Sequence, residues 1–349
     1  MSWPDKNSIT QSVVDMLNVN MKLKAGEKLL VVSDYPRPDD WHNYSYLRLE
    51  GMLERVLLAR LVTEIAREQF VDTQVWFHPF LATGMSGREP DSETASVMKS
   101  ADVLLCLTEH SLSQTDAREA ATKANVRIAS MPTFDHKMFA PDGPMAIDYQ
   151  QVSADSKKFA DLLSAADQVV VQTPYGTDLS FRLFGRIGQV DDGLYGDAPE
   201  LWGNLPAGEA YVIPLEGTGE GRLVILVGWY PELYEEMVLT FKKGSVVDLQ
   251  GGGEIGKQFS TLLNLKSNDE PYRPRRNLAG LGIGTNPNAR RPDNVLEGEK
   301  IKGSVHIAIG DNIHMGGKVE SDLHEDFVQP QADLYLDGVP VILQGKWKV

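Results

Sequence analysis

The stretch Ser304-Val305-His306-Ile307-Ala308-Ile309-Gly310 alternates strictly and sets the expectations for the rest of the chain. Successive side chains of a strand point to opposite faces of a sheet. The three β-branched residues therefore share one face and should enter a core, whereas His306 shares the other face with serine, alanine and glycine. These small neighbours leave open space around the imidazole. We expect His306 to be a metal ligand or catalytic group; the alternative is a polar residue satisfied within the core.

The motif His324-Glu325-Asp326 lies eighteen residues downstream of His306. On an extended backbone, side chains two apart point the same way, so His324 and Asp326 can aim an imidazole and a carboxylate at one point. A divalent cation of borderline softness takes nitrogen and oxygen ligands together. The alternative is a surface histidine and aspartate in an acidic loop. We predict a metal site formed by His306, His324 and Asp326.

Two further polar residues are expected at the same site. Glu254 follows three glycines at the start of a helix predicted over residues 251–265. Carboxylates are favoured at helix N-termini, which would explain Glu254 without a function, but we favour a metal ligand that also handles protons. His314, in a predicted loop, is the second candidate catalytic residue.

The segment from Tyr272 to Pro287 is basic at its start and glycine-rich afterwards. Its glycine spacing with Asn-Pro predicts tight turns where the backbone approaches another group closely. It is no dinucleotide fingerprint, because it does not open a clear strand–helix unit. Arg276 and Asn277 are expected to bind substrate, the arginine by recognising an anionic group; solvated loop charge is the alternative.

Composition narrows the classes of partner. The net charge of −15 argues against nucleic acid, whose phosphates require basic stripes. No segment offers the ~18 consecutive apolar residues of a membrane helix, and the N-terminus lacks a signal pattern. We therefore expect a cytoplasmic protein acting on a small molecule or short peptide, without a membrane partner. The single cysteine, Cys106, lies in an apolar run and should be a buried core thiol.

The order of predicted elements indicates the fold class. Apolar strands alternate with amphipathic helices in the first half, which is typical of an α/β domain with a mainly parallel sheet. The strands are expected at 28–33, 73–77, 101–107 and 126–131, and the helices at 8–24, 50–70, 91–100 and 112–124. From about residue 167, closely spaced strands follow with glycine- and proline-rich turns. We predict an α/β domain over 1–160 and a β-rich α+β domain over 161–349 that carries the metal site.

Several of these motifs together resemble the thermophilic (M29) metallo-aminopeptidases and their leucyl-aminopeptidase-like relatives. The resemblance is carried by four segments, with a looser likeness through the first half: 176–179 (GTDL), 204–209 (NLPAGE), 277–287 (NLAGLGIGTNP) and 303–326, which includes His306, Gly316-Gly317 and His324-Glu325-Asp326. It implies two divalent ions, often zinc or cobalt, removal of N-terminal residues from peptides, and a homodimer. Carried over by position, Glu254, His306, His324 and Asp326 would be the metal ligands.

Position 280 departs from the pattern that the resemblance implies. The family supplies a second glutamate ligand there, whereas this chain has Gly280, which has no side chain to donate. Three explanations stay open: a neighbour such as Glu297 or Glu299 substitutes, only one metal binds, or peptidase chemistry is lost.

The superfamily also includes iron(II) 2,5-dihydroxypyridine ring-cleaving dioxygenases, which use two histidines and one aspartate. Their His-x-Asp matches His324 and Asp326, and their remaining histidine also falls at Gly280, so His306 would have to take its place. We favour a metal-dependent aminopeptidase with Zn, Co or Mn, in which metal-activated water attacks the peptide. The alternatives are an Fe(II) dioxygenase acting on a hydroxylated, pyridine-type ring, and a degenerate homologue that only binds a ligand.

Overall fold

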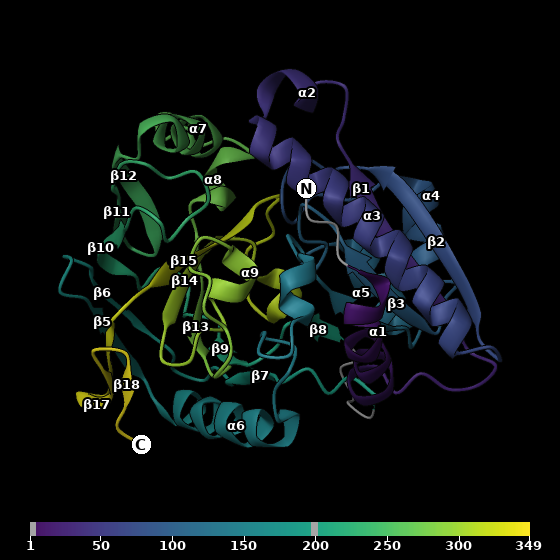
Figure 1. The fold of residues 1–349 in the computed structure, drawn as a ribbon. Coiled ribbons are helices and arrows are strands. Elements are labelled where there is room, and N and C mark those ends of the chain that lie inside the picture. Colours follow the sequence, from purple (N-terminus) through teal and green to yellow (C-terminus); the bar gives the residue numbers. More distant parts are fainter. Residues whose placement is uncertain (1–4, 197–201) are drawn as a thin grey trace. The chain divides into compact units, whose positions relative to one another are not determined.

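The computed structural model describes residues 5–196 and 202–349 and divides the chain into two compact units (Figure 1). The first unit comprises Met1–Tyr149 with Gly193–Ala207, and the second comprises Gln150–Asp192 with Gly208–Val349. The predicted boundary at residue 160 falls inside a continuous helix, α6 (Tyr149–Ala165).

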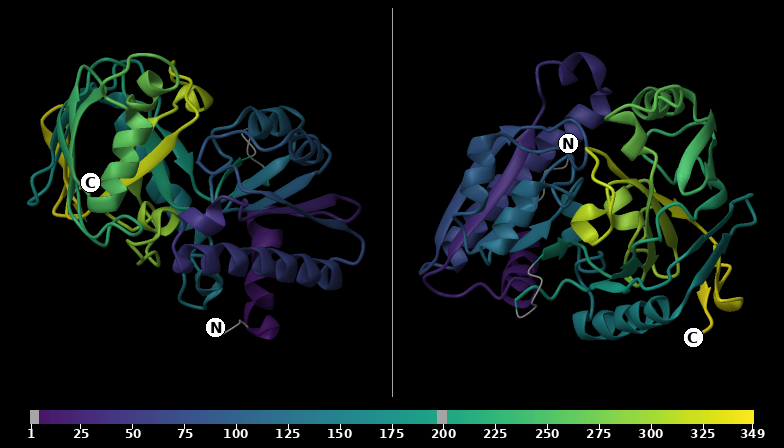
Figure 2. Two further views of the ribbon diagram at one scale, coloured as in Figure 1. Left: turned by 90° about the horizontal axis from the view of Figure 1, so that it is seen from above. Right: turned by 180° about the vertical axis from the view of Figure 1, so that it is seen from behind.

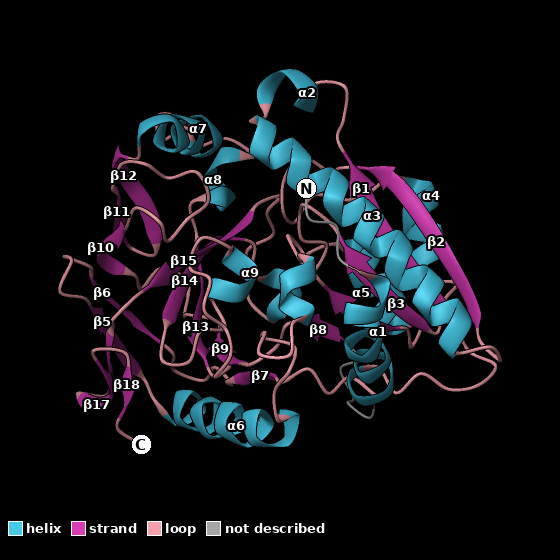
Figure 3. Cartoon of the chain, in the orientation of Figure 1, coloured by secondary structure: helices cyan, strands magenta, loops and turns pink. Residues whose placement is uncertain are grey.

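The first unit is built on a five-stranded, wholly parallel sheet in the order β2-β1-β3-β4-β8. Its strands are β1 (Lys28–Tyr35), β2 (Gln74–Leu81), β3 (Val103–Leu107), β4 (Arg127–Ser130) and β8 (Trp202–Asn204). Its helical segments are α1 (Lys6–Asp15), η1 (Met16–Asn20), α2 (Asp40–Asn43), α3 (Tyr46–Gln69), α4 (Ser92–Met98), α5 (Asp116–Lys123) and η2 (His136–Phe139). The predicted α/β architecture with a parallel sheet is therefore confirmed for this unit (Figure 3).

Alternating apolar side chains of this sheet build the core beneath the helices. Leu30, Val32, Leu104 and Cys106 pack with residues of α4 and α5 in one cluster, so Cys106 is a buried thiol as expected. On the other side, α3 packs along β1 and β2 (Figure 2). Within α3, Met52, Leu58, Ala59 and Val62 are buried, while Leu53 and Leu57 are exposed.

The second unit consists mainly of two antiparallel sheets, which agrees with the predicted β-rich character. The larger sheet has the order β12-β11-β10-β6-β5-β16-β17-β18. Its strands are β5 (Gln168–Gln172), β6 (Asp178–Arg182), β10 (Glu220–Ile225), β11 (Met237–Lys242), β12 (Ser245–Gly251), β16 (Asp333–Leu336), β17 (Val339–Leu343) and β18 (Lys346–Trp347). An Asp337-Gly338 turn joins β16 to β17, and both turn residues have positive φ.

The smaller sheet, in the order β15-β14-β13-β9-β7, carries the residues that matter for function. Its strands are β7 (Gln189–Asp191), β9 (Glu209–Val212), β13 (Leu278–Gly284), β14 (Val305–Gly310) and β15 (His324–Gln329). The predicted turns over the glycine-rich segment are wrong for residues 278–284, which form the fully buried strand β13. The short helices of this unit, besides α6, are α7 (Gly253–Leu263), α8 (Tyr272–Arg275), α9 (Val295–Gly298) and η3 (Ile313–Met315).

Within residues 5–196 and 202–349, no helix combines the length and apolar character that a membrane crossing requires.

Candidate metal centre

One face of the smaller sheet gathers ionisable side chains from β9, β14 and β15, the strands labelled in Figure 1. Paired residues of antiparallel strands point to the same face. Asp326 pairs with Ala308 and His324 with Gly310, so both side chains of the His-x-Asp motif share the face of His306. On the other side of β14, Glu209 of β9 pairs with Gly284 of β13, which places a glutamate on the same face.

The ring of His306 lies close to three carboxylates. Its Nε2 lies 3.3 Å from Glu209 Oε2 and 3.9 Å from Glu299 Oε2. The same Nε2 is 3.9 Å from Asp326 Oδ1, while His324 Nε2 is 3.3 Å from Asp326 Oδ2. The two histidines therefore approach opposite oxygens of one carboxylate. The sequence prediction that the segments around 306 and 324 bring their side chains together is borne out by this geometry.

Glycines on β13 make room for the cluster. A Cβ at position 282, which pairs with His306, would lie 2.0 Å from Cε1 and 2.1 Å from Nε2 of that ring. A Cβ at position 284 would lie 2.2 Å from the carbonyl oxygen of Ile301. Gly282 thus lets the imidazole lie flat on the sheet, and Gly284 lets the segment 299–301 cross it. The close approach inferred from the glycine spacing is real, but it occurs on a strand.

Lys300 ties two of the carboxylates together. Its ammonium donates to Glu209 Oε1 at 2.7 Å and to Glu299 Oε1 at 3.3 Å, and its side chain is completely buried. Each glutamate therefore turns one oxygen to Lys300 and the other to His306. Buried charges need such partners to offset lost hydration.

Backbone bonding orients His324. The Nδ1 of its ring lies 2.8 Å from the carbonyl oxygen of Asp311, so Nδ1 carries the proton and donates to that oxygen. The arrangement leaves Nε2 facing Asp326. Metal-binding histidines are commonly held in this way by a second hydrogen bond on the other ring nitrogen.

The charges of the cluster shift its pKa values in opposite directions. Burial acts to lower the pKa of His324, but the Asp326 carboxylate and the Asp311 carbonyl outweigh it and raise that pKa to about 9. Burial acts to raise the pKa of Asp326, yet His324 and His306 bring it down to about 2. Burial lowers the pKa of His306 and raises that of Glu299 well above its ordinary value. The centre therefore mixes a neutral imidazole with a carboxylate that readily holds a proton.

The donor set fits a metal ion. One donor atom each from Glu209, Glu299 and His306 lies within 4.8 Å of the others, the spacing of ligands around a single cation. Among the described residues, Glu209 Oε2 is buried without a hydrogen-bond partner, which is a costly state for a carboxylate oxygen unless it binds something. His324 and Asp326 complete a set of two imidazoles and three carboxylates.

The structure does not bring Glu254 to this cluster. Its side chain is 75% exposed in the first turn of α7 and pairs with Lys257 at 3.0 Å. The favourable position of a carboxylate at a helix N-terminus accounts for it. The prediction of a metal ligand at 254 is therefore wrong in its geometry.

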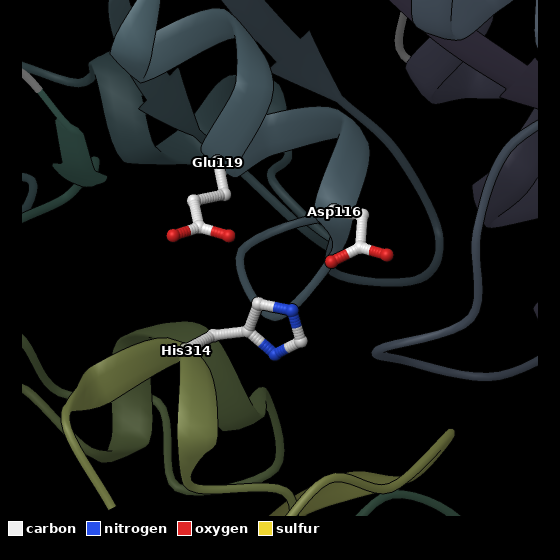
Figure 4. A group of neighbouring side chains, drawn as sticks. All are labelled: Asp116, Glu119 and His314. Carbon is white, nitrogen blue, oxygen red and sulfur yellow. The ribbon is translucent and has the colours of Figure 1, made fainter.

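His314, drawn in Figure 4, lies in η3. Its Nδ1 is 2.9 Å from Asp311 Oδ2, so the residue supports the segment whose carbonyl orients His324. Asp116 and Glu119, also drawn in Figure 4, occupy the first turn of α5, where carboxylates complement the helix dipole. The catalytic role expected of His314 stays a prediction.

Arg276 and Asn277 are both buried and bound to the protein itself. The guanidinium of Arg276 donates to the carbonyl oxygen of Ser267 at 2.8 Å, and Asn277 Nδ2 donates to the carbonyl oxygen of Gly310 at 3.0 Å. Arg276 thus contacts the segment between α7 and α8, and Asn277 ties the start of β13 to the end of β14. The substrate contacts expected of both residues stay a prediction.

Sequence reasoning missed Glu209 and Lys300. Glu209 ends the segment 204–209 that carries the family resemblance, yet that pattern assigned it no role. Lys300 gave no signal in the sequence, because its partner Glu209 lies in β9 and only the fold brings the two together. Glu299 was named as one of two substitutes for the ligand absent at Gly280, and it is the one that faces His306.

The chain is similar to known proteins both in sequence and in structure. The family model of NicX, 2,5-dihydroxypyridine 5,6-dioxygenase, matches residues 19–349. A 2,5-dihydroxypyridine 5,6-dioxygenase of Pseudomonas putida is 27% identical over 198 residues, which are 53% of this chain and 55% of that protein. The chain therefore spans just over half the length of this curated relative.

Two solved structures share the fold. The 2,5-dihydroxypyridine dioxygenase of Pseudomonas putida KT2440 superimposes with a TM-score of 0.70 at 18% identity, covering 99% of this chain and 98% of that one. The wild-type AmpT of Thermus thermophilus gives a TM-score of 0.64 at 16% identity, covering 99% of this chain and 100% of that one. At such identities these likenesses show the fold alone.

The matches correct the sequence-based prediction of function. The sequence alone favours an aminopeptidase, that is, a hydrolase with metalloprotease chemistry. The model that matches almost the whole chain describes a dioxygenase, and so does the curated relative. The aminopeptidase prediction is therefore wrong, and the dioxygenase alternative is the better supported one.

Proposed function

Because the chain belongs to the NicX family of 2,5-dihydroxypyridine 5,6-dioxygenases, we propose that it is an iron(II)-dependent dioxygenase that opens a hydroxylated, pyridine-type ring. The metal, the substrate class and the ligands are parts of this proposal. What supports them is the chemistry of the cluster on the smaller sheet.

The single observation that carries the proposal is the convergence of His306 and His324 on Asp326. Two imidazoles and one carboxylate form the donor set of non-haem iron(II) oxygenases. His306 Nε2 and His324 Nε2 approach the two oxygens of Asp326 at 3.9 and 3.3 Å. Ligand atoms about 2.1 Å from one cation lie roughly 3 Å or more apart, so these separations suit a shared ion.

When bound, ferrous iron would supply the open positions at which oxygen and a ring hydroxyl meet. The chain's own residues would do the rest. His324 would be held in the ligating tautomer by the Asp311 carbonyl. Glu299, whose pKa burial raises, could exchange a proton with a ring hydroxyl, and Glu209 Oε2 offers a second acceptor beside His306.

Oxygen consumption tests the proposal. Protein purified without chelator and loaded anaerobically with Fe(II) should consume oxygen when 2,5-dihydroxypyridine is added, and should not do so with Zn(II). His324→Ala and Asp326→Ala should lower the rate by more than the roughly 10–100-fold typical of changes outside the coordination shell. Glu254→Gln is the matched control, since this exposed carboxylate lies outside the cluster and its loss should leave the rate unchanged.

Two results would refute the proposed function. If protein holding one equivalent of iron consumes no oxygen with 2,5-dihydroxypyridine or with mono- and dihydroxylated pyridines bearing a carboxylate, the proposal fails. If Zn(II) protein consumes oxygen as fast as Fe(II) protein, the reaction does not depend on iron and the proposal fails as well.

A further inference from the structure

The position of Lys300 between two glutamates has a consequence for how many metal ions the centre can hold. The ammonium contacts Oε1 of Glu209 and Oε1 of Glu299, at 2.7 and 3.3 Å. The remaining oxygen of each glutamate faces His306 Nε2. Lys300 and the ring of His306 thus stand on opposite sides of a pair of bridging carboxylates.

Bridging carboxylates commonly hold two cations, one at each pair of oxygens. Here the pair Glu209 and Glu299 offers the same arrangement, but a lysine ammonium takes one of the two cation positions. We propose that Lys300 acts as a built-in second cation and so restricts the centre to one divalent ion, bound on the His306 side. The inference rests on the metal centre of the proposed function, and not on its oxygen chemistry.

The formal charges of the cluster support this assignment. The ammonium of Lys300 contacts both Glu209 and Glu299 and offsets part of the negative charge that these carboxylates can carry. One divalent ion on the His306 side can balance the carboxylate oxygens that Lys300 does not contact. Without the ammonium, the same donors would leave enough negative charge and enough oxygen atoms to attract a second ion.

The backbone around Lys300 keeps its ammonium in place. Its carbonyl oxygen accepts a hydrogen bond from the amide of Asn286 at 2.9 Å, and its own amide donates to Glu297 at 3.1 Å. The segment crosses β13 over Gly284, where even a methyl group would collide with it. These contacts fix the backbone from which the fully buried Lys300 side chain reaches the two glutamates.

Counting bound ions tests the inference. Apo protein would be dialysed to equilibrium against Mn²⁺, and the ions per folded chain measured by elemental analysis. Wild-type protein should bind one ion, and Lys300→Met, which keeps the length of the side chain but removes its charge, should bind two. Lys302→Met is the matched control, because Lys302 pairs with Asp155 outside the cluster, and it should bind one.

Two further measurements cover a variant that retains the charge and a variant that fails to fold without metal. Lys300→Arg retains the charge and should still bind one ion. If Lys300→Met unfolds without metal, refolding in Mn²⁺ should recover a chain that holds two ions, and failure to recover it counts against the proposal. Two ions in wild-type protein, or one in folded Lys300→Met, overturn it. Because Mn²⁺ counting needs no turnover, inactive protein that follows this pattern would sink the proposed function and leave the inference standing.

Discussion

Replacing Gly282 with alanine should displace the His306 ring and weaken metal binding while the sheet stays folded. The added Cβ would lie 2.0 Å from Cε1 of the ring, and an ordinary van der Waals contact begins at 3.4 Å. The ring must therefore retreat by about 1.4 Å, whereas coordination bonds tolerate deviations of only about 0.2 Å. We expect the affinity for a divalent ion to fall by about 100-fold or more, beyond the loss caused by a displaced outer-shell group.

The matched control lies two residues away on the same strand and face. A Cβ at Gly280 would lie 3.2 Å from the Cβ of Ala308, so a shift of a few tenths of an ångström accommodates it. Gly280→Ala should therefore keep the metal affinity within about two-fold, and its free energy of unfolding should change by less than the ~1–3 kcal/mol of an overpacked core. Calorimetric titration of apo protein with Mn²⁺ measures both variants.

The result that refutes the reasoning is folded Gly282→Ala protein that binds Mn²⁺ as tightly as wild type. That outcome would mean that His306 does not ligate, or that its ring has room to turn aside without leaving the ion. Equal losses in both glycine variants would also contradict it, because only position 282 touches the imidazole.

Two further predictions concern stability. Burial raises the pKa of Asp34 to about 7, so this carboxyl holds a proton in the folded state at pH values where the unfolded chain has lost it; the free energy of unfolding should fall by up to about 4 kcal/mol as pH rises from about 4 to 7. Asp34→Asn mimics the protonated form and should remove most of this fall, which denaturant titrations at pH 4.5 and 8 would detect; an unchanged pH dependence contradicts it. Chelation of a bound ion should lower the free energy of unfolding by about 2.7 kcal/mol when the ion had been present at 100 times its dissociation constant. A melting temperature that does not change when chelator is added would contradict a metal centre that stabilises the fold.

The sequence predicted β14, and the shared direction of His324 and Asp326, because both signals are local. Alternation of small and β-branched residues in 304–310 specifies a strand with two different faces, and β14 has that strand at Val305–Gly310. The same period of two puts His324 and Asp326 together. Neither inference needs to know what lies across the sheet.

The glycine-rich strand β13 could not be predicted in the same way. Isolated glycines have low strand propensity and usually mark turns, so 277–287 was assigned to turns. The segment is a strand because Gly280, Gly282 and Gly284 fall on one face, where neighbouring groups fill the missing side-chain volume. That benefit belongs to tertiary packing and leaves no trace in local propensity.

Glu254 and Glu209 also show that a local sequence pattern does not identify a metal ligand. Glu254 had a local pattern, an acid after glycines at a helix start, and the structure satisfies it locally with Lys257. Glu209 had no such pattern, since its role follows from the register that pairs β9 with β13 and sets it opposite Gly284. A carboxylate becomes a ligand through what other strands place around it, which spacing along one segment cannot reveal.

The structure favours one of the three explanations for Gly280, namely that Glu299 takes the place of the glutamate expected at that position. Gly280 pairs with Ala308, which in turn pairs with Asp326, so a glutamate there would point at the Asp326 carboxylate. Glu299 instead reaches His306 from the segment that crosses β13, and Lys300 beside it offsets its charge. Moving the second carboxylate from the strand to this segment therefore brings a lysine with it. The absent ligand at 280 and the single ion expected at the centre then belong to one arrangement, and Gly280→Glu alone should still bind a single Mn²⁺ because Lys300 is retained.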